Sequence, residues 1–490
     1  MELTNILSGL EGLKVKGTLE VEVHQIQSSS NKIKEGDMFI AIDGFETDGH
    51  KYIKDAIQKG AKVIMAQEDK VTKDVIKELP GDITFILAPD TRHAISICAC
   101  NFYKNPSHKI KLIGVTGTKG KTTTTFMIKS LLEKQGFKVG LIGTICTYIG
   151  DKNLGDNDRT TPESLELQEL LSKMVKEKCD FAVMEVSSQS LKLGRVDGCK
   201  FEIGIFTNFS KDHISPKEHP SMEDYFESKV KLFKMCKYAY INSDDIYANK
   251  LPGLVPECEF RTYGIDNPAN LLAKDITVTN SYVDFKVKLG DKNQRVKTDI
   301  PGRFSVYNSL AAISVGLRYG CTPENISEAL INVRVPGRSE LVDNDREITI
   351  MIDYAHTPES LESILTTVQE YTIGDVICVF GCGGDRDSGK RPIMGEISGT
   401  KADYTIITSD NPRTEKPEKI VEQIEAGIKK TKGKYECIVD RKQAIKKAIE
   451  MAHKKDMVLI CGKGHELTQE INGKKYPFDE REIIKQILTE

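Results

Sequence analysis

Residues 114–125, GVTGTKGKTTTT, combine glycines, lysines and hydroxyls at a spacing that suits phosphate binding. The backbone N–H groups of such a loop and the N-terminus of a following helix attract an anion. Lys121 would then reach the outer phosphates of a nucleotide, and the Thr122 hydroxyl would bind Mg²⁺. Val115 takes the position of the usual first glycine, so the cradle is TGTKGKT, residues 116–122. The alternative is a glycine-rich turn with an exposed lysine.

The segments on either side of this loop help to decide between the two interpretations. KIKLIGV, residues 109–115, predicts a short buried strand. TTTTFMIKSLLEKQG, residues 122–136, predicts a helix, because Met127 and Leu131 are four residues apart and share a face. Gly136 stands where a helix C-cap glycine belongs. A strand, a glycine-rich loop and a helix form the context that a P-loop requires.

The composition is that of an ordinary globular chain. Its 490 residues suggest about three domains, and 39% of them are hydrophobic and 29% charged. A net charge of −3 gives no reason to expect a nucleic-acid partner, and no apolar run approaches the ~20 residues of a membrane helix. The 12 cysteines lack zinc-like spacing and no signal peptide is evident, so we expect reduced thiols in a cytoplasmic protein. We take a monomer as the starting hypothesis.

The chain divides into three predicted α/β domains, residues 1–97, 98–333 and 334–490. Short segments that predict strands occupy the first domain: LEVEVHQIQ, GDMFIAIDG, AKVIMAQ and ITFILA. In the other two domains, buried strands end in polar clusters, as in FAVMEVSSQS, IGIFTNFSKDHI, VICVFGCGGDRD and YTIITSDNPRTE. Ligands bind beyond the carboxyl ends of parallel strands, so both domains are predicted to present a polar rim.

Two of these strand ends carry candidate metal ligands. Glu185 ends FAVME, where a carboxylate near a P-loop suits Mg²⁺ either directly or through water. Asp212 and His213 follow the next strand, and His213 could bind a second metal, although Mg²⁺ prefers oxygen ligands. The alternative for each residue is a capping or solvated side chain.

Lys229 is a candidate of a different kind. SMEDYFESKVKLF, residues 221–233, predicts a helix that begins with the S-x-x-D pattern of Ser221 and Asp224. Lys229 lies beside the apolar stripe of this helix. A partly buried lysine tends to lose its proton, and a neutral amine reacts with CO₂ to give an anionic carbamate. Composition alone favours an ordinary lysine on the flank of the helix.

Several motifs, in their order along the chain, resemble the Mur ligase family: TGTKGKTTTT, TTPESLELQ, MEVSSQSL, FTNFSKDH, DYAHTPESL, GCGGDRDSGKRP, SDNPRTE and GKGHE. The resemblance covers essentially the whole chain. It implies an α/β fold of three domains: a UDP-sugar-binding domain, a central P-loop ATPase domain and a Rossmann-like C-terminal domain for the incoming amino acid. The implied reaction is amide formation, in which ATP phosphorylates a carboxylate and an amine attacks the acyl phosphate.

The resemblance also implies partners and residue roles. The substrates would be UDP-N-acetylmuramoyl-L-alanyl-D-glutamate and meso-diaminopimelate, used with ATP and Mg²⁺ in peptidoglycan precursor synthesis. The implied ATP-binding residues are Thr116, Gly117, Thr118, Lys119, Gly120, Lys121, Thr122, Asn308, Arg338, Asp353 and His356. The implied metal ligands are Thr122, Glu185, His213 and carbamylated Lys229, and the catalytic set is Lys121, Glu185, His213 and Lys229. The implied UDP-sugar residues are Ser30, Thr160, Thr161, Ser187 and Arg195. The implied diaminopimelate residues are Arg386, Asp410, Asn411, Pro412, Arg413, Gly462 and Glu466.

The motif around Arg413 bears on which amino acid is accepted. Diaminopimelate carries a second carboxylate, which an arginine can bind through two parallel hydrogen bonds, whereas the terminal ammonium of lysine would be repelled. Glu466 suits the far ammonium group. At the nucleotide-sugar end the chain departs from the family pattern, with Ser29, Ser30 and Asn31 in place of Asp-Ser-Arg.

Further departures from the family pattern are Arg159, Leu193 and Ser305. Three alternatives therefore stay open. The chain is a paralog that uses L-lysine, another amino acid or another carboxylate. It is a sister ligase, such as a folylpolyglutamate or cyanophycin synthetase. Or it is a non-catalytic nucleotide-binding protein with a ligase fold.

Overall fold

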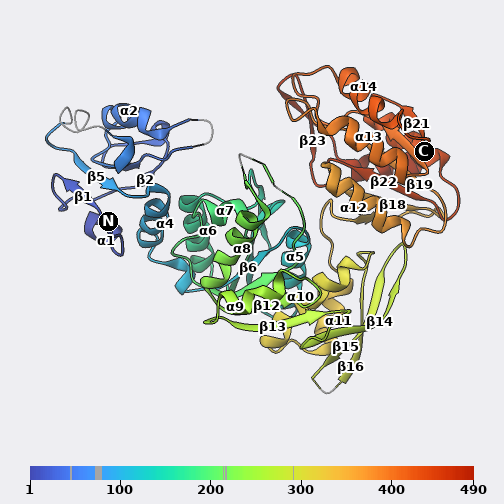
Figure 1. Ribbon diagram of the computed structural model, residues 1–490, viewed down its shortest axis with the longest axis horizontal. Helices are drawn as coiled ribbons and strands as arrows, with labels where there is room; N and C mark the ends of the chain where they lie inside the picture. The colour runs from blue at the N-terminus through green and yellow to red at the C-terminus, as the bar shows by residue number, and fades with distance from the viewer. Residues whose placement is uncertain (45–46, 72–79, 213, 216–217, 291) are drawn as a thin grey trace. The chain divides into compact units, whose positions relative to one another are not determined.

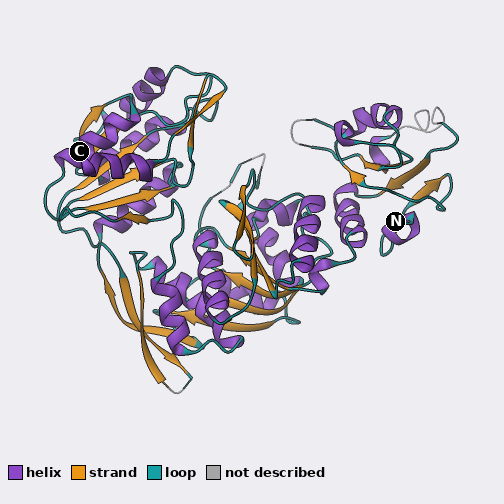
Figure 2. Ribbon diagram, turned by 180° about the vertical axis from the view of Figure 1, so that it is seen from behind, coloured by secondary structure: helices purple, strands orange, loops and turns teal. Residues whose placement is uncertain are grey.

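The computed structural model describes residues 1–44, 47–71, 80–212, 214–215, 218–290 and 292–490. The chain forms two compact units, Met1–Lys121 with Gly136–Thr262, and Thr122–Gln135 with Tyr263–Glu490. Both units combine helices and sheets, which confirms the predicted α/β class (Figure 2). The domain boundaries near residues 97 and 333 stay a prediction. All 12 cysteines are free, and no helix in the described ranges has the length and apolar character needed to cross a membrane.

The first unit begins with a small mixed sheet in the order β1-β5-β4-β3-β2. Its strands are β1 (Lys14–Lys16), β2 (Ile26–Gln27), β3 (Met38–Ile40), β4 (Val63–Gln67) and β5 (Thr84–Ala88), with helices α1 (Leu3–Ile6), α2 (Ile53–Gln58) and α4 (Thr91–Phe102). The prediction of one strand over LEVEVHQIQ, residues 19–27, was wrong for most of its length. Val21 O and Val23 N hydrogen-bond to the start of the chain, so only β2 at the end of the segment joins the sheet.

The same unit contains the part of a larger sheet that carries the predicted P-loop, with strands in the order β12-β11-β6-β10-β7-β8-β9. Figure 1 labels β6 and β12 of this part. The central strands are parallel, while β8 pairs antiparallel with both β7 and β9. Because β6 lies between β11 and β10, the loop that follows β6 emerges at the middle of the sheet edge. The strands are β6 (Lys111–Thr116), β7 (Val139–Ile142), β8 (Cys146–Ile149), β9 (Lys152–Asp156), β10 (Phe181–Glu185), β11 (Phe201–Phe206) and β12 (Cys236–Asn242). The helices are α6 (Ser164–Lys176), α7 (Ser188–Lys192), α8 (Met222–Lys234) and α9 (Leu251–Leu254).

Two helix predictions in this region are confirmed. The helix after the P-loop is α5 (Lys121–Lys134), and Gly136 follows it with a positive φ of 96°. Helix α8 starts after Ser221, whose hydroxyl accepts a hydrogen bond from the backbone N–H of Asp224. A hydroxyl cap of this kind satisfies one of the free N–H groups at the start of a helix, which is why the S-x-x-D pattern predicted where α8 begins.

The second unit contains most of α5, the helices α10 and α11, an antiparallel set β14-β15-β16 and a mostly parallel C-terminal sheet in the order β17-β18-β22-β19-β20-β21. Strand β13 (Glu259–Gly264) begins in the first unit and ends in the second. The other elements of the first group are β14 (Leu271–Val278), β15 (Val283–Leu289), β16 (Lys292–Thr298), α10 (Phe304–Arg318) and α11 (Pro323–Ile331). The C-terminal strands are β17 (Glu340–Val342), β18 (Thr349–Asp353), β19 (Val376–Phe380), β20 (Tyr404–Ile407), β21 (Lys434–Cys437), β22 (Met457–Cys461), β23 (Thr468–Ile471) and β24 (Lys474–Pro477). The C-terminal helices are α12 (Pro358–Gln369), α13 (Lys390–Lys401), α14 (Pro417–Ile428), α15 (Arg441–Met451) and α16 (Glu480–Thr489).

The C-terminal sheet has an apolar cluster on each face. Met351 and Leu459 belong to the cluster that includes residues of α12, α13 and α14. Ile350 and Val458, their neighbours in sequence, belong to the cluster that includes residues of α15 and α16. Since successive side chains of a strand point to opposite faces, strands covered on both sides are apolar throughout, as ITIMID and MVLIC are.

Candidate active site

The loop after β6 has the backbone of a phosphate-binding cradle. Gly117 has φ +144° and Gly120 has φ +85°, conformations that favour glycine. A Cβ atom on Gly117 would overlap the Thr207 hydroxyl and lie 3.0 Å from the Asn208 carbonyl oxygen. The glycine is therefore required by a close approach of two backbones as well as by its φ angle.

Thr207 and Asn208, which follow β11, brace this loop. The Thr207 hydroxyl donates to the Lys119 carbonyl at 2.7 Å, and the Asn208 Oδ1 accepts from the Lys119 N–H at 2.9 Å. The Asn208 carbonyl accepts from the Thr118 N–H at 2.8 Å. Neither residue was predicted to support the loop, although both stand in the motif FTNFSKDH. The only signal was their position directly after a strand predicted to lie in the same sheet.

Two lysines converge on the loop from different helices. Lys121, the first residue of α5, donates from Nζ to the carbonyl oxygens of Gly117 and Thr118 at 2.9 and 3.0 Å. Lys229, on α8, donates from Nζ to the same Gly117 carbonyl at 2.9 Å, and its Nζ lies 4.4 Å from the centroid of the Tyr225 ring. The structure therefore places these two predicted catalytic side chains at one carbonyl.

Lys229 is more deeply buried than the sequence indicated. Only 1% of the residue is exposed, whereas its place on the helix flank suggested partial burial. Burial lowers the pKa of Lys229 well below its ordinary value, and the nearby charge of Lys121 lowers it further. Both effects favour the neutral amine, the form that reacts with CO₂.

Glu185 lies at the end of β10 with a fully buried side chain. Its two carboxylate oxygens accept hydrogen bonds from the backbone N–H and the hydroxyl of Thr144, at 2.7 and 3.1 Å. His213, the other predicted ligand at a strand end, lies outside the described residues. Among the residues that are described, no group of three or more His, Cys, Asp and Glu side chains is arranged to hold a metal ion.

Four of the predicted UDP-sugar residues form a hydrogen-bonded chain next to Glu185. Thr160 and Thr144 share a hydrogen bond of 3.0 Å between their hydroxyls. The Thr161 hydroxyl donates to the Glu185 carbonyl at 2.9 Å and accepts from the Ser187 N–H at 3.1 Å. The guanidinium group of Arg195 donates to the Thr161 carbonyl at 3.2 Å.

Ser30, the fifth of these residues, lines a cavity of about 620 Å³ together with Arg195. The same cavity is also lined by four positions where the chain departs from the family pattern: Ser29, Asn31, Arg159 and Leu193. All the departures that were named, except Ser305 on α10, therefore gather at one place in the first unit. Two further side chains of the lining, Glu163 and Arg92, add charge, and Glu163 pairs with Arg195 at 2.9 Å.

The predicted nucleotide residues of the second unit lie in two places. On α10, Asn308 is buried, its Oδ1 accepts from the Thr124 hydroxyl at 3.3 Å, and its Nδ2 has no hydrogen-bond partner in the described part of the chain. Around β18, the Arg338 guanidinium lies 4.9 Å from the centroid of the Tyr354 ring. The Asp353 carboxylate accepts from the backbone N–H groups of Ser339 and Ala355, at 2.8 and 2.9 Å.

His356, at the end of the same segment, is exposed, and its Nδ1 lies 2.8 Å from the Tyr354 carbonyl oxygen. The Tyr354 and His356 rings are also in contact, with centroids 4.5 Å apart. The structure thus gathers Arg338 and His356 around one tyrosine ring, which the sequence analysis did not single out.

The residues predicted to bind the amino acid surround the loops after β20 and β22. Asp410 and Asn411 are buried, and a Cβ atom on Gly462 would lie 2.6 Å from the Asp410 carboxylate. Arg413 has φ +50°, donates from its guanidinium to the Gly384 carbonyl at 2.7 Å and lies 3.3 Å from the Glu470 carboxylate.

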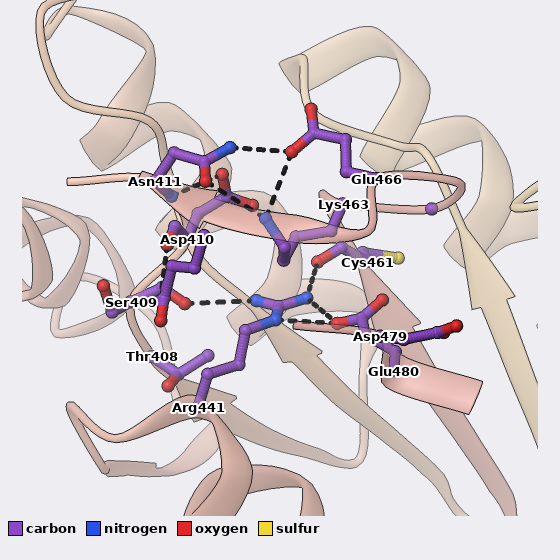
Figure 3. A network of polar contacts seen from close by, with 12 residues as sticks. Thr408, Ser409, Asp410, Asn411, Arg441, Cys461, Lys463, Glu466, Asp479 and Glu480 are labelled. Atoms are coloured by element: carbon purple, nitrogen blue, oxygen red, sulfur yellow. Dashed lines mark hydrogen bonds and ion pairs between the residues drawn. The ribbon is translucent and has the colours of Figure 1, made fainter. Parts of the chain in front are cut away.

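Pro412 packs close to this turn, because a Cβ atom on Gly384 would overlap the Pro412 carbonyl. Arg386 is exposed. Glu466 contacts Asn411 and also the ammonium group of Lys463, a residue that the sequence analysis did not single out (Figure 3).

Three family models match the chain in succession. They are the Mur ligase family, catalytic domain over residues 22–103, the Mur ligase middle domain over residues 115–316, and the Mur ligase, glutamate ligase domain over residues 337–464. A curated protein of Caldanaerobacter subterraneus subsp. tengcongensis is 48% identical, over 100% of this chain and 99% of its own length. The chain belongs to the Mur ligase family.

Other relatives of this Mur ligase also align over their whole length. A curated protein of Clostridium acetobutylicum is 44% identical over 100% of both chains. Both relatives carry the name UDP-N-acetylmuramoyl-L-alanyl-D-glutamate–2,6-diaminopimelate ligase, the second with the suffix 1. A solved structure with the same name is 29% identical, covers 100% of this chain and 99% of its own, and superposes with a TM-score of 0.70.

Proposed function

We propose that this Mur ligase joins meso-diaminopimelate to UDP-N-acetylmuramoyl-L-alanyl-D-glutamate with hydrolysis of ATP, in peptidoglycan precursor synthesis. The observation that carries the proposal is the 48% identity, over the full length, to a relative named for this reaction. We also keep the division into domains at residues 1–97, 98–333 and 334–490 as part of the proposal.

The P-loop fits the triphosphate of ATP. Its glycines adopt the positive φ angles that a tight loop requires, and Lys121 supplies a positive charge at the start of α5. Lys121 would exchange its bonds to the loop carbonyls for bonds to the γ-phosphate. This charge helps two anions, a phosphate and a carboxylate, to approach each other. Thr116, Thr118 and Lys119 complete the cradle, and Asn308, Arg338, Asp353 and His356 are proposed to hold the rest of the nucleotide.

Mg²⁺, when bound, would neutralise charge on the phosphates. Oxygen donors suit this ion, and we propose the Thr122 hydroxyl, the Glu185 carboxylate and the carbamate of Lys229, together with His213. A carboxylate has about four lone-pair sites, and the two hydrogen bonds from Thr144 hold the Glu185 carboxylate in place. Carbamylation joins the neutral amine of Lys229 to the carbon of CO₂ and releases one proton, and the deep burial of Lys229 favours that amine.

The cavity of about 620 Å³ in the first unit is the proposed site of the UDP-sugar. Three of its lining residues, Arg92, Arg159 and Arg195, carry positive charge that suits a diphosphate. Ser30 lies in the same lining, while Thr160, Thr161 and Ser187 would orient the far end of the substrate. An altered carboxylate substrate remains the second candidate, because four departures from the family pattern line this cavity.

The proposed amino-acid site is built on the loops after β20 and β22. Arg413 would bind the distal carboxylate of diaminopimelate through two parallel hydrogen bonds, with help from Arg386. Asp410 and Glu466 would receive the distal ammonium, Asn411 would hold the Glu466 carboxylate in place, and Pro412 and Gly462 would shape the turns.

Phosphate release tests the proposal. The purified protein is given ATP, Mg²⁺ and UDP-N-acetylmuramoyl-L-alanyl-D-glutamate, with either meso-diaminopimelate or L-lysine. Release with diaminopimelate alone is the expected result. Equal release with L-lysine would refute the proposed specificity. No release with either amino acid, from protein that still binds ATP, would refute the proposed carboxylate substrate.

A further inference from the structure

Lys463 is an ammonium group with no access to solvent. Its side chain is 0% exposed, whereas its ion-pair partner Glu466 is 32% exposed. Nζ donates to Asn411 Oδ1 at 3.1 Å, to Glu466 Oε2 at 3.1 Å and to the Thr468 carbonyl at 2.7 Å. An ammonium group has three donors, so these acceptors satisfy it completely, as a buried charge requires.

The bonds of Lys463 fix the direction of the Asn411 side-chain amide. Asn411 Oδ1 accepts from Lys463 and also from the Glu470 backbone N–H at 2.9 Å, so the amide oxygen faces two donors. The amide nitrogen then faces Glu466 Oε2 at 2.7 Å (Figure 3). Turning the amide over would place its NH₂ group against an ammonium and an N–H group, which is unfavourable.

Glu466 is fixed by the same arrangement. Its Oε2 accepts from both Lys463 and Asn411, while its Oε1 makes no hydrogen bond within the described residues. Figure 3 shows this second oxygen pointing away from the network. One carboxylate oxygen is thus used for support, and the other remains for an external cation.

The backbones of both loops are held by a different pair. Arg441 donates to the carbonyls of Ser409 and Cys461, at 3.3 and 2.8 Å, where the chain leaves β20 and β22. It also pairs with Glu480 at 2.7 Å, and both of these side chains are 0% exposed. Arg441 thus holds the backbone at the start of both loops. The main effect of Lys463 is therefore on the direction of the Asn411 and Glu466 side chains rather than on the path of the backbone.

We infer that Lys463 is a positioning residue that sets selectivity for the amino acid, by holding the Glu466 carboxylate, both directly and through the Asn411 amide, in one orientation toward the distal ammonium group of the amino acid. This inference rests on the proposed function. The Lys463 side chain has no exposed surface, so it acts through the Glu466 and Asn411 side chains rather than by contact with the substrate.

The test is Lys463→Met, which keeps the length of the side chain and removes its charge. Because Lys463→Met leaves buried acceptors without their donor, the KM for diaminopimelate should rise about 10- to 100-fold, which corresponds to about 1.4–2.8 kcal/mol. The KM for ATP should stay within about twofold of the wild-type value, because the loss is local to the amino-acid site. Lys485→Met is the matched control, because Lys485 is 64% exposed and pairs with another surface residue.

A double mutant distinguishes positioning from a loss of folding. If Lys463 acts through Glu466, then Lys463→Met should have little further effect on the diaminopimelate KM in a Glu466→Gln background. Full additivity of the two changes would overturn the inference. If Lys463→Met melts early, Lys463→Gln replaces it, and an unchanged diaminopimelate KM in a folded variant would also overturn it. Failure of the proposed function is seen separately, as absence of diaminopimelate-dependent phosphate release in the wild-type protein.

Discussion

Gly117→Ala is the substitution whose effect the structure defines most sharply. The new Cβ would overlap the Thr207 hydroxyl and lie 3.0 Å from the Asn208 carbonyl oxygen. Thr207 donates to the Lys119 carbonyl at 2.7 Å and to the Thr116 carbonyl at 3.3 Å, so relief of the overlap breaks or stretches these bonds. We expect the P-loop to shift away from the loop that follows β11.

The magnitude follows from two contributions. A side chain at positive φ costs about 1–2 kcal/mol, and two hydrogen bonds contribute about 0.5–1.5 kcal/mol each. The total destabilisation is therefore about 2–5 kcal/mol. A displacement of the reacting groups by about 1 Å costs on the order of 100-fold in rate, so ATP-dependent phosphate release should fall at least that much.

Gly136→Ala is the matched control, because Gly136 also has positive φ, at +96°, but no atom lies within 4 Å of the position of its Cβ. It should lose only the backbone contribution of about 1–2 kcal/mol and keep the wild-type rate. The assays are phosphate release under saturating substrates and thermal unfolding of both variants. A Gly117→Ala protein with the wild-type rate would refute the argument that close packing of the two loops forms the phosphate site.

Three further predictions follow from other contacts. Lys229→Ala should abolish phosphate release, and a short-chain carboxylate added to the assay should restore part of that activity. Full activity without the added carboxylate would contradict a carbamate at this position. Arg413→Ala should raise the KM for diaminopimelate by about 10-fold or more, because it removes a charge-assisted pair with the distal carboxylate, and should leave the KM for ATP unchanged. An unchanged KM for diaminopimelate would exclude binding of that carboxylate by Arg413. Arg391 binds both oxygens of Glu415, at 2.8 and 2.9 Å, and lowers the pKa of Glu415 from 4.5 to about 2. This pair therefore stabilises the fold above pH 4.5 and loses its effect as the pH falls toward about 2, so the Tm difference between wild type and Glu415→Gln should shrink over that range; a difference that grows on acidification would contradict the assignment.

The sequence predicted those parts of the site that depend on near neighbours in the chain. The strand before the P-loop, the helix after it and the glycine at position 136 were all confirmed. The start of α8 at Ser221 was confirmed for the same reason, since a hydroxyl and an N–H group three residues apart decide it. The strand over residues 19–27 was wrong, because its backbone bonds go to the start of the chain.

By itself, then, the sequence determined the local elements, the motifs and the chemical types gathered at the strand ends, since backbone geometry and periodicity act over a few residues. Only the tertiary structure decided which distant residues meet. Pairing of β11 with β6 brings Asn208 to Lys119, 89 residues away, and α8 carries Lys229 to Gly117, 112 residues away. The bond from Lys463 to Asn411 likewise spans 52 residues. These contacts depend on strand order and burial, which fix the protonation and direction of a side chain only after the sheets have formed.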